Sequence, residues 1–186
     1  ISAFTFAQEG NNSVKFNLGT SFSKPGDELA TVAMDGKNMQ LSVSAEAARF
    51  FNYKKDSKVW DTQLTINLGF NRQNERDFKT RKTNDNFIFV SNYGRQLSEK
   101  LYLTTQLDAR TQLLPGYKYS KPAGAESEIR TKISDLLSPG YLQSSTGLNY
   151  RNNYPDKSRI SVILSPFTGR FTMVMDDSLS RAGAFG

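Results

Sequence analysis

Strict alternation of polar and apolar residues is the feature that most constrains how this chain can fold. In residues 60–70, every second position from Trp60 to Phe70 is apolar or threonine, and the positions between are polar or glycine. Residues 101–113 repeat the pattern from Leu101 to Leu113. A helix would scatter these two sets around its circumference, whereas a β-strand places successive side chains on opposite faces. The alternation therefore predicts two amphipathic strands.

Weaker copies of the alternation predict further strands. They cover residues 14–22, 39–47, 86–95, 142–150, 160–164 and 171–175, so that about eight strands are expected in all. Ser165–Gly169 is predicted to be a tight turn between the last two. The high share of aromatic residues, 12%, and the mean hydropathy of −0.54 suit a sheet with one polar and one apolar face. We therefore expect an all-β fold.

The connections between the predicted strands alternate in length. They run over residues 23–37, 54–58, 72–84, 97–100, 115–139 and 152–158, with long and short in turn. Transmembrane β-barrels show this asymmetry, because their periplasmic turns are short and their external loops are long. The fold class expected is an antiparallel up-and-down (meander) transmembrane-type β-barrel, incomplete at the C-terminus. Aromatic residues near both strand ends are typical of the girdles of such barrels.

The polar strand face separates a membrane barrel from a soluble one. It carries mostly Ser, Thr, Asn and Gln, and the charges are concentrated in loops and turns. A soluble protein usually exposes more Lys and Glu on its strands. The pattern therefore favours a polar lumen and an apolar face toward lipid. The expected polar and charged lumen residues are Glu46, Asp61, Gln106, Asp108 and Arg110. Asp108 and Arg110 share a face, and either a filter for solutes or a structural network could use them.

Two predicted external loops could bind partners. The loop 72–84 contains a basic set, Arg72, Arg76, Lys79, Arg81 and Lys82, which could contact lipopolysaccharide phosphates or be merely solvated. The loop 115–139 is long and rich in Pro and Gly, so it is the candidate for contacts with envelope proteins or for a plug-like element. The surrounding partner would be outer-membrane lipid.

Composition excludes several chemistries. The chain has no histidine and no cysteine, which removes disulfides, zinc fingers, cysteine nucleophiles and Ser-His-Asp triads. Phosphate-binding and nucleophile-elbow motifs are absent too. Asp176 and Asp177 are adjacent, so on a strand they would point to opposite faces and would not form a metal pair. We expect no catalytic residue, no metal site and no cofactor. Nucleic acid is not expected as a partner, although the net charge is +6.

The ends of the chain suggest secretion and a longer reading frame. Residues 1–8 resemble the end of a signal peptide, with Thr5 and Ala7 at the positions that precede a cleavage site; a short first strand is the alternative. Residues 9–186 are then a single barrel domain, present as a fragment.

A series of short motifs carries a family resemblance. The series is Lys79–Asn86, Tyr93-Gly94, Thr111-Gln112, Pro115–Tyr117, Ile133–Tyr141, Gly147–Tyr150, Leu164–Gly169 and Ala182–Gly186. It resembles the Bacteroidetes domain-of-unknown-function family of predicted outer-membrane β-barrel proteins, over roughly residues 37–186. The resemblance implies an outer-membrane location and further strands beyond Gly186, and it brings no established activity. Residues 23–38 depart from the family pattern, since they lack its Trp and Gly-Gly-Glu-like stretch.

The functional expectation is a non-enzymatic barrel in the bacterial outer membrane, either a pore or a scaffold of an envelope complex. A membrane-embedded lipid-modifying enzyme is one alternative, and its base would be a carboxylate. A soluble periplasmic lipid-binding barrel is the other. In that case Leu64, Ile66, Leu103 and Leu107 would line a cavity instead of facing lipid.

Overall fold

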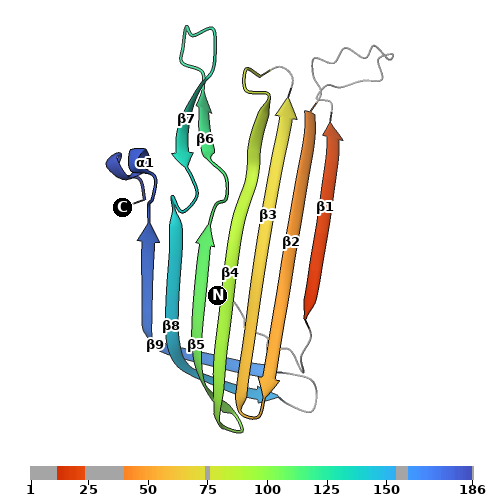
Figure 1. Cartoon of the computed structure of the whole chain (residues 1–186), viewed down its shortest axis with the longest axis vertical. Helices are drawn as coiled ribbons and strands as arrows, with labels where there is room; N and C mark the ends of the chain where they lie inside the picture. Colours follow the sequence, from red (N-terminus) through yellow and green to blue (C-terminus); the bar gives the residue numbers. More distant parts are fainter. Residues whose placement is uncertain (1–11, 24–39, 74–75, 154–158, 186) are drawn as a thin grey trace.

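The computed structural model of the chain describes residues 12–23, 40–73, 76–153 and 159–185. Nine strands and one short helix follow each other along these residues (Figure 1). They are β1 (Ser13–Ser23), β2 (Gln40–Lys55), β3 (Lys58–Gln73), β4 (Thr80–Ser98), β5 (Leu101–Thr111), β6 (Gly116–Ser120), β7 (Ile129–Ser134), β8 (Gly140–Asn153), β9 (Arg159–Met173) and α1 (Asp177–Arg181). The predicted leader, residues 1–8, and most of the predicted connections 23–37 and 152–158 lie outside the described residues.

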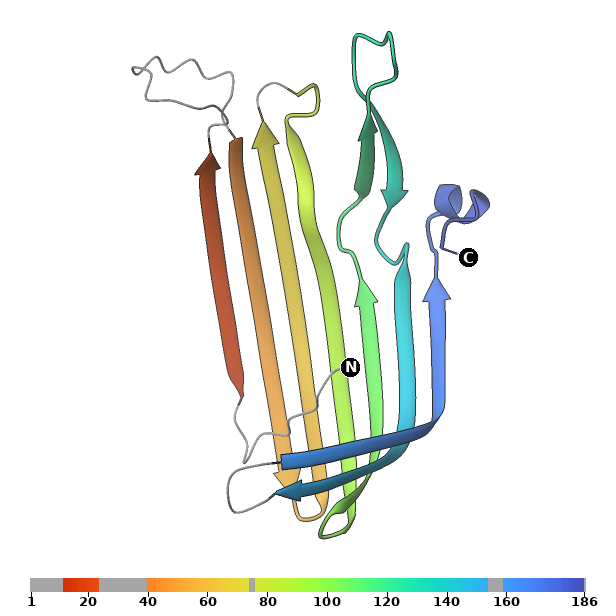
Figure 2. The same ribbon diagram turned by 180° about the vertical axis from the view of Figure 1, so that it is seen from behind.

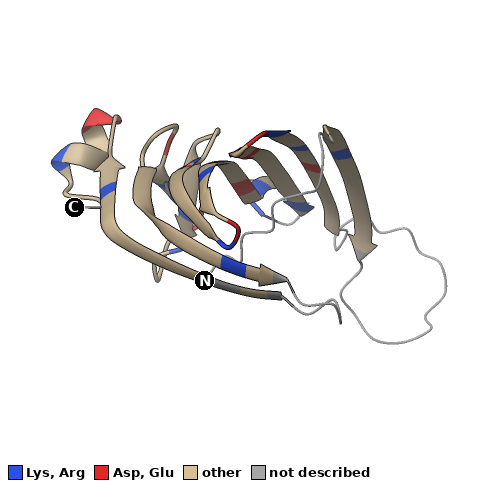
Figure 3. Cartoon of the chain, turned by 90° about the horizontal axis from the view of Figure 1, so that it is seen from below, with Lys and Arg blue, Asp and Glu red and all other residues tan. Residues whose placement is uncertain are grey.

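Seven strands form one antiparallel meander in the order β1-β2-β3-β4-β5-β8-β9. The expectation of an all-β, antiparallel, up-and-down sheet is confirmed. The sheet is curved but open: seen end-on, the strands follow an arc (Figure 3), and among the described residues β1 and β9 are not paired with each other. β6 and β7 form a separate two-stranded sheet above the main one (Figures 1 and 2).

The turn between β2 and β3 is explained by the residues that form it. Lys55 pairs with Lys58, so only Asp56 and Ser57 connect the strands. Two-residue hairpin turns that match the twist of a sheet require positive φ, which Asp and Asn tolerate better than most residues. Asp56 has a φ of 52°. The predicted connection 54–58 is therefore a tight hairpin turn.

Three expectations about strand boundaries were wrong. The first is the tight turn at Ser165–Gly169, because these residues lie inside the continuous strand β9. The register shifts there: Thr146 pairs with Phe167 and Leu148 with Leu164, so Ser165 and Pro166 together oppose Gly147. A bulge of this kind accommodates a proline, which has no N–H to give to the ladder. The bulge, not a turn, explains the break in alternation.

The second and third errors concern the long loops. The predicted loop 115–139 contains the hairpin of β6 and β7, whose strands are too short for a clear period-two signal. The predicted loop 72–84 is shorter than expected, because β3 extends to Gln73 and β4 begins at Thr80. Arg72, Arg81 and Lys82 therefore lie within strands, and only Arg76 and Lys79 of the basic set lie in the connection. The charged residues at these strand ends interrupt the alternation of polar and apolar residues, so the pattern indicated a loop.

The described residues have almost no apolar core. Only Ala48, Val59 and Leu179 are buried hydrophobic residues. Large hydrophobic side chains instead stand exposed on one face of the sheet, at up to 75% for Phe167. This exposed set, here called the apolar face, contains Val14, Phe16, Leu18, Phe22, Tyr53, Trp60, Phe70, Tyr93, Leu103, Leu107, Leu148, Tyr150, Val162, Leu164, Phe167 and Phe171.

Candidate functional site: the polar face of the sheet

The opposite face of the sheet, here called the polar face, gathers the predicted lumen residues. Strand register places Asp61 beside Asn92 and Asn92 beside Gln106, so one row of polar side chains crosses β3, β4 and β5. Asp108 and Arg110 follow Gln106 at two-residue spacing, and Glu46 faces Asn67 across β2 and β3. All five predicted residues thus share one face, because residues two apart on a strand point the same way.

The polar face is the concave side of the sheet. Asp61 on β3 interacts electrostatically with Arg151 on β8, although β4 and β5 separate the two strands. Side chains on strands that are not neighbours can meet only across the hollow side of a curved sheet. β8 and β9 bend near their lower ends toward the lower ends of β2 and β3 (Figure 2). Arg151 lies near the end of β8, two positions before its last residue.

Most charges on the polar face are already engaged. Arg110 Nε and Nη2 donate to Asp108 Oδ1 and Oδ2, both at 2.8 Å. The Arg170 guanidinium lies 4.6 Å from the centre of the Tyr141 ring, and the Lys15 ammonium lies 5.4 Å from that of Phe50. Glu46 has no ion-pair or hydrogen-bond partner among the described residues. It is therefore the charge most available to a ligand.

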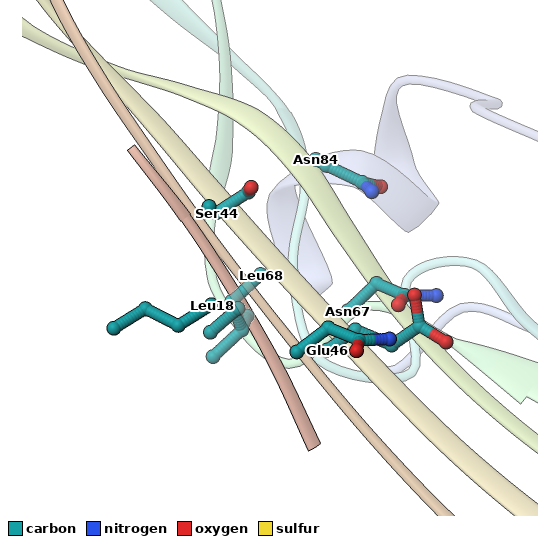
Figure 4. A pocket seen from close by; sticks show the side chains of 9 residues that line it. Leu18, Ser44, Glu46, Asn67, Leu68 and Asn84 are labelled. Carbon is teal, nitrogen blue, oxygen red and sulfur yellow. The ribbon is translucent and has the colours of Figure 1, made fainter. Parts of the chain in front are cut away.

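Glu46 lies in a hollow of about 300 Å³ between β1 and β4. Its polar neighbours in the hollow are Asn17, Ser44, Asn67 and Asn84. Figure 4 shows Ser44, Glu46, Asn67 and Asn84 extending to one side of the strands and Leu18 and Leu68 extending to the other. The lining also contains Leu18, Ala45 and Leu68. Its polar groups are amides, a hydroxyl and one carboxylate, which together can both donate and accept hydrogen bonds. The sequence did not single out this hollow, although alternation alone places Asn67 on the polar side of β3.

Three oxygen atoms lower on the polar face are buried without a hydrogen-bond partner. They are Asp61 Oδ1, Asn92 Oδ1 and Thr104 Oγ1, from three neighbouring strands. Of the three residues, Asp61 is the one that interacts with Arg151 on β8. Within the described residues, no group of three or more carboxylates could hold a metal ion.

The basic set does not form one phosphate site in this structure. Arg81 pairs with Glu128, and its guanidinium lies 4.1 Å from the centre of the Tyr119 ring. Lys82 Nζ donates to Asp85 Oδ2 at 2.7 Å and to Leu114 O at 2.7 Å. Arg72, Arg76 and Lys79 are exposed. Two of the five cations therefore hold the structure together, and three are accessible.

Asp85 organises the end of β5. Its carboxylate accepts the backbone N–H groups of Leu113 at 2.9 Å and Leu114 at 2.8 Å as well as the Lys82 ammonium. These N–H groups would otherwise continue the ladder with β4. The side chain thus ends the pairing and turns the chain toward the hairpin of β6 and β7.

The hairpin itself is fastened at two levels. At its upper part, Phe78 packs on Tyr119 with ring centres 5.4 Å apart, and the Glu128 N–H donates to Asp77 Oδ2 at 2.6 Å. At its base, Lys132 pairs with Asp135 and, at 2.5 Å, with Asp176. Hydrogen bonds from Lys132 lower the pKa of both carboxyls, and the two carboxylates, Asp135 first, raise the pKa of Lys132. The segment that was predicted to be a long loop, residues 115–139, thus contains an anchored hairpin.

Asp176 also begins the helix α1. Its carboxylate accepts the Leu179 N–H at 2.9 Å, as an N-cap does. Ser138, which is fully buried, accepts the N–H groups of Met175 at 2.9 Å and Asp176 at 2.8 Å. The segment after β9 is therefore tied to the base of the hairpin. No helix in the described part of the chain is long and apolar enough to cross a membrane.

Comparison with known proteins adds a family likeness and no activity. Residues 33–117 match the model of a family described as protein of unknown function (DUF3078). The match runs through β2, β3, β4 and β5, which supports the resemblance to an uncharacterised family for that part of the chain. No curated protein and no solved structure matches the chain.

Proposed function

We propose that the sheet is part of the wall of a β-barrel in the bacterial outer membrane, and that the protein is a non-enzymatic pore or a scaffold of an envelope complex. The observation that carries this proposal is the placement of the two faces. A soluble sheet buries its apolar face and exposes its polar one. Here the convex face is the apolar one, and the concave face is polar, which is the arrangement of a transmembrane barrel.

The aromatic residues support a membrane boundary near the lower strand ends. Tyr53, Trp60 and Tyr93 are direct neighbours across β2, β3 and β4, and all three are exposed on the apolar face. Phe51 stands edge-on to Trp60 with ring centres 6.0 Å apart. An exposed band of this kind matches a girdle at a membrane interface. The upper ends give weaker support, because Tyr141 neighbours Arg110 on the polar face instead.

The soluble lipid-binding alternative is less consistent with these faces. It requires Leu64, Ile66, Leu103 and Leu107 to line a cavity. Leu103 and Leu107 are instead 41% and 38% exposed on the convex side. The lipid-modifying enzyme has no specific observation in its favour. Of the described carboxylates on the polar face, Asp108 is paired with Arg110, and Asp61 interacts electrostatically with Arg151, which leaves Glu46 without either.

The number of strands in the meander determines how many more strands an antiparallel barrel needs to close. The meander has seven strands, so its two edge strands, β1 and β9, run in the same direction. A strand that pairs antiparallel with both must run the opposite way. An all-antiparallel barrel therefore needs an odd number of strands in addition to these seven. Such closure also satisfies the backbone groups of both edges, which lipid cannot.

The test uses the full-length natural protein, refolded into lipid vesicles and planar bilayers. If the protein is a barrel, the unboiled sample should resist unfolding and migrate differently in electrophoresis from the boiled sample. If the barrel is a pore, it should give stepwise conductance in planar bilayers. A protein that folds and inserts but gives no conductance would refute the pore and support the scaffold. In the scaffold role, the hairpin of β6 and β7 contacts envelope proteins. The exposed cations Arg72, Arg76 and Lys79 contact lipopolysaccharide. A protein that remains water-soluble and monomeric without lipid would refute the membrane assignment.

A further inference from the structure

We propose that the hollow around Glu46 is a binding subsite for an uncharged, hydroxyl-rich solute, which means a saccharide, on the inner wall of the barrel. The inference rests on the proposed function, because it takes the polar face to line an aqueous interior. It adds the chemical class of the solute. Binding sites for small molecules in proteins are usually concave and present a few convergent polar groups.

Strand register aligns the donors and acceptors in one row. Asn17 on β1 pairs with Glu46 on β2, Glu46 pairs with Asn67 on β3, and Asn67 pairs with Asn86 on β4. With neighbouring strands about 4.8 Å apart, the row spans about 14 Å. A carboxylate flanked by carboxamides along this length can contact several hydroxyl groups of one ligand.

Small residues lie next to this row of polar side chains. Gly19, Ser44 and Gly69 form the next row on the same face. A Cβ at Gly19 would lie 2.7 Å from Ser44 Oγ, and one at Gly69 would lie 2.8 Å from Thr83 Oγ1. At these two positions the Ser44 and Thr83 side chains therefore occupy the space that a larger residue would need. The hollow beside them has a volume of about 300 Å³, at the lower end of the range of ligand pockets.

The mixture of groups favours hydroxyls over ions. Each carboxamide offers both an acceptor and donors, and the carboxylate accepts two hydrogen bonds, which matches hydroxyls that donate and accept at once. An anion would be repelled by Glu46. A divalent metal ion would usually recruit more carboxylates than the one in this row, and no such group of carboxylates occurs among the described residues. The nearest other charge on the polar face by strand register is Lys15 on β1, whose ammonium lies 5.4 Å from the centre of the Phe50 ring and forms no ion pair with Glu46.

Binding is measured by titration calorimetry on the full-length protein in detergent micelles, with maltose and cellobiose as neutral probes and cadaverine and Ca²⁺ as cationic probes. We expect saturable, millimolar binding of at least one disaccharide. Asn67→Leu should weaken that binding at least tenfold, since the pocket then lacks a donor and an acceptor. The matched control is Gln106→Leu, the same loss of an amide on the polar face outside the hollow, which should change binding less than twofold.

Glu46→Gln separates the two ligand classes. The amide keeps its hydrogen bonds to hydroxyls and loses the negative charge, so disaccharide binding should fall only about fivefold. If the variant instead abolishes all binding, and the wild-type protein prefers cadaverine or Ca²⁺, the hollow is a cation site and the inference is wrong. It is equally wrong if neither disaccharide binds saturably, or if Asn67→Leu and Gln106→Leu behave alike.

Folding is checked in each variant by the mobility shift on boiling. Asn17→Leu, on the edge strand β1, provides a second probe of the row should Asn67→Leu fail to fold. Failure of the two proposals can be told apart. A protein that inserts into vesicles and does not bind a disaccharide refutes the subsite alone. A protein that binds a disaccharide and does not insert refutes the membrane assignment alone.

Discussion

Arg110 holds Asp108, two positions earlier on β5, through two parallel hydrogen bonds of 2.8 Å on the polar face of the sheet. Strand geometry brings the two side chains to the same side, and the planar guanidinium matches the two carboxylate oxygens. The Arg110 side chain remains 54% exposed, so water screens the pair.

Removal of the cation from this pair should change ion selectivity more than stability. Arg110→Gln should cost less than about 1 kcal/mol of unfolding free energy, the usual value of an exposed pair. It leaves Asp108 unpaired in the proposed lumen, so the reversal potential of bilayer currents should shift toward cation selectivity. Asp108→Asn is the matched variant and should shift it the opposite way. Equal shifts from both variants would contradict the placement of the pair in a conducting lumen.

Charges introduced on the apolar face should impair membrane folding. Ile66→Arg and Leu107→Arg should each cost about 2–4 kcal/mol if these positions lie at mid-depth, because a lipid-facing cation is costly there. Gln106→Arg, next to Leu107 but on the polar face, should be much milder. The measurement is reversible denaturant unfolding in lipid vesicles. A reversed order of the three variants would mean that the faces are assigned the wrong way round.

Removal of a charge that already lies on the apolar face, that of Arg49, should stabilise the protein instead of destabilising it. It pairs with Val14 and Leu64 in the middle of the apolar face, four positions above the Trp60 level on β3. Arg49→Leu should therefore stabilise the protein in vesicles by up to about 2–4 kcal/mol. Lys54→Leu, at the end of β2 near the turn, should have little effect. No gain from Arg49→Leu would mean that this part of the face contacts water or another protein.

The backbone approach at Gly147 should make that position intolerant of a side chain. A Cβ there would lie 2.0 Å from the Leu164 carbonyl oxygen and 2.6 Å from the Ser165 Cα, and both belong to the backbone of the β9 bulge. Gly147→Ala should destabilise the protein by about 3 kcal/mol, at the upper end of overpacking costs. Gly169→Ala is the control, because its nearest neighbour would be 3.9 Å away. Similar unfolding midpoints for the two variants would contradict the bulge.

The attachment of the hairpin base should depend on pH. The pKa values of Asp135 and Asp176 are lowered by Lys132, so their contribution is present above about pH 4, the ordinary carboxyl value, and is lost as the pH falls through the lowered values. Lys132, with a raised pKa, contributes up to its ordinary value of about 10 and loses its contribution only above it.

Amide hydrogen exchange of residues 129–134 measures this dependence. Protection should be constant between about pH 5 and 9, after correction for intrinsic exchange, and should fall below about pH 4. Asp176→Asn should reduce protection across that plateau while the main sheet stays unchanged. An acid response identical in wild type and Asp176→Asn would assign it to other groups.

Thr104 and Thr111 should respond differently to the same substitution. The Thr104 hydroxyl oxygen is buried without a partner, so Thr104→Val should be neutral or stabilising. The Thr111 hydroxyl accepts the Leu137 N–H at 2.9 Å and donates to Pro139 O at 3.3 Å. Thr111→Val should therefore cost about 1–3 kcal/mol by leaving a buried donor unsatisfied. Unfolding free energies of the two variants in vesicles decide this directly.

Long, alternating strands were predictable because their signal is local. Residues 60–70 and 101–113 show period two without interruption, and β3 and β5 follow them closely, apart from the end of β5 at Thr111. That end could not be foreseen, since it depends on Asp85, 28 positions away from Leu113, which takes the N–H groups that the ladder would use. Alternation records which side of a strand a residue faces, and it does not record where pairing stops.

The sequence predicted which face of the strands carries the candidate site, but it did not predict where on that face the site lies. Alternation placed Glu46, Asp61, Gln106, Asp108 and Arg110 on one side of their strands, and the register agrees. It could not identify the hollow at Glu46, because Asn17 and Asn67 are 50 positions apart and become neighbours of Glu46 only through register. Nor could it show that Arg81 and Lys82 are engaged, since their partners Glu128 and Leu114 are distant in sequence.

The sequence by itself determined the strand periodicity, the chemistry of each face and the antiparallel meander, because these depend on side chains one or two positions apart and on short turns. Only the tertiary structure decided which face is concave, where β9 bulges instead of turning, and how the hairpin of β6 and β7 is anchored. These features depend on contacts between strands far apart along the chain, and a local pattern carries no information about the register that brings them together.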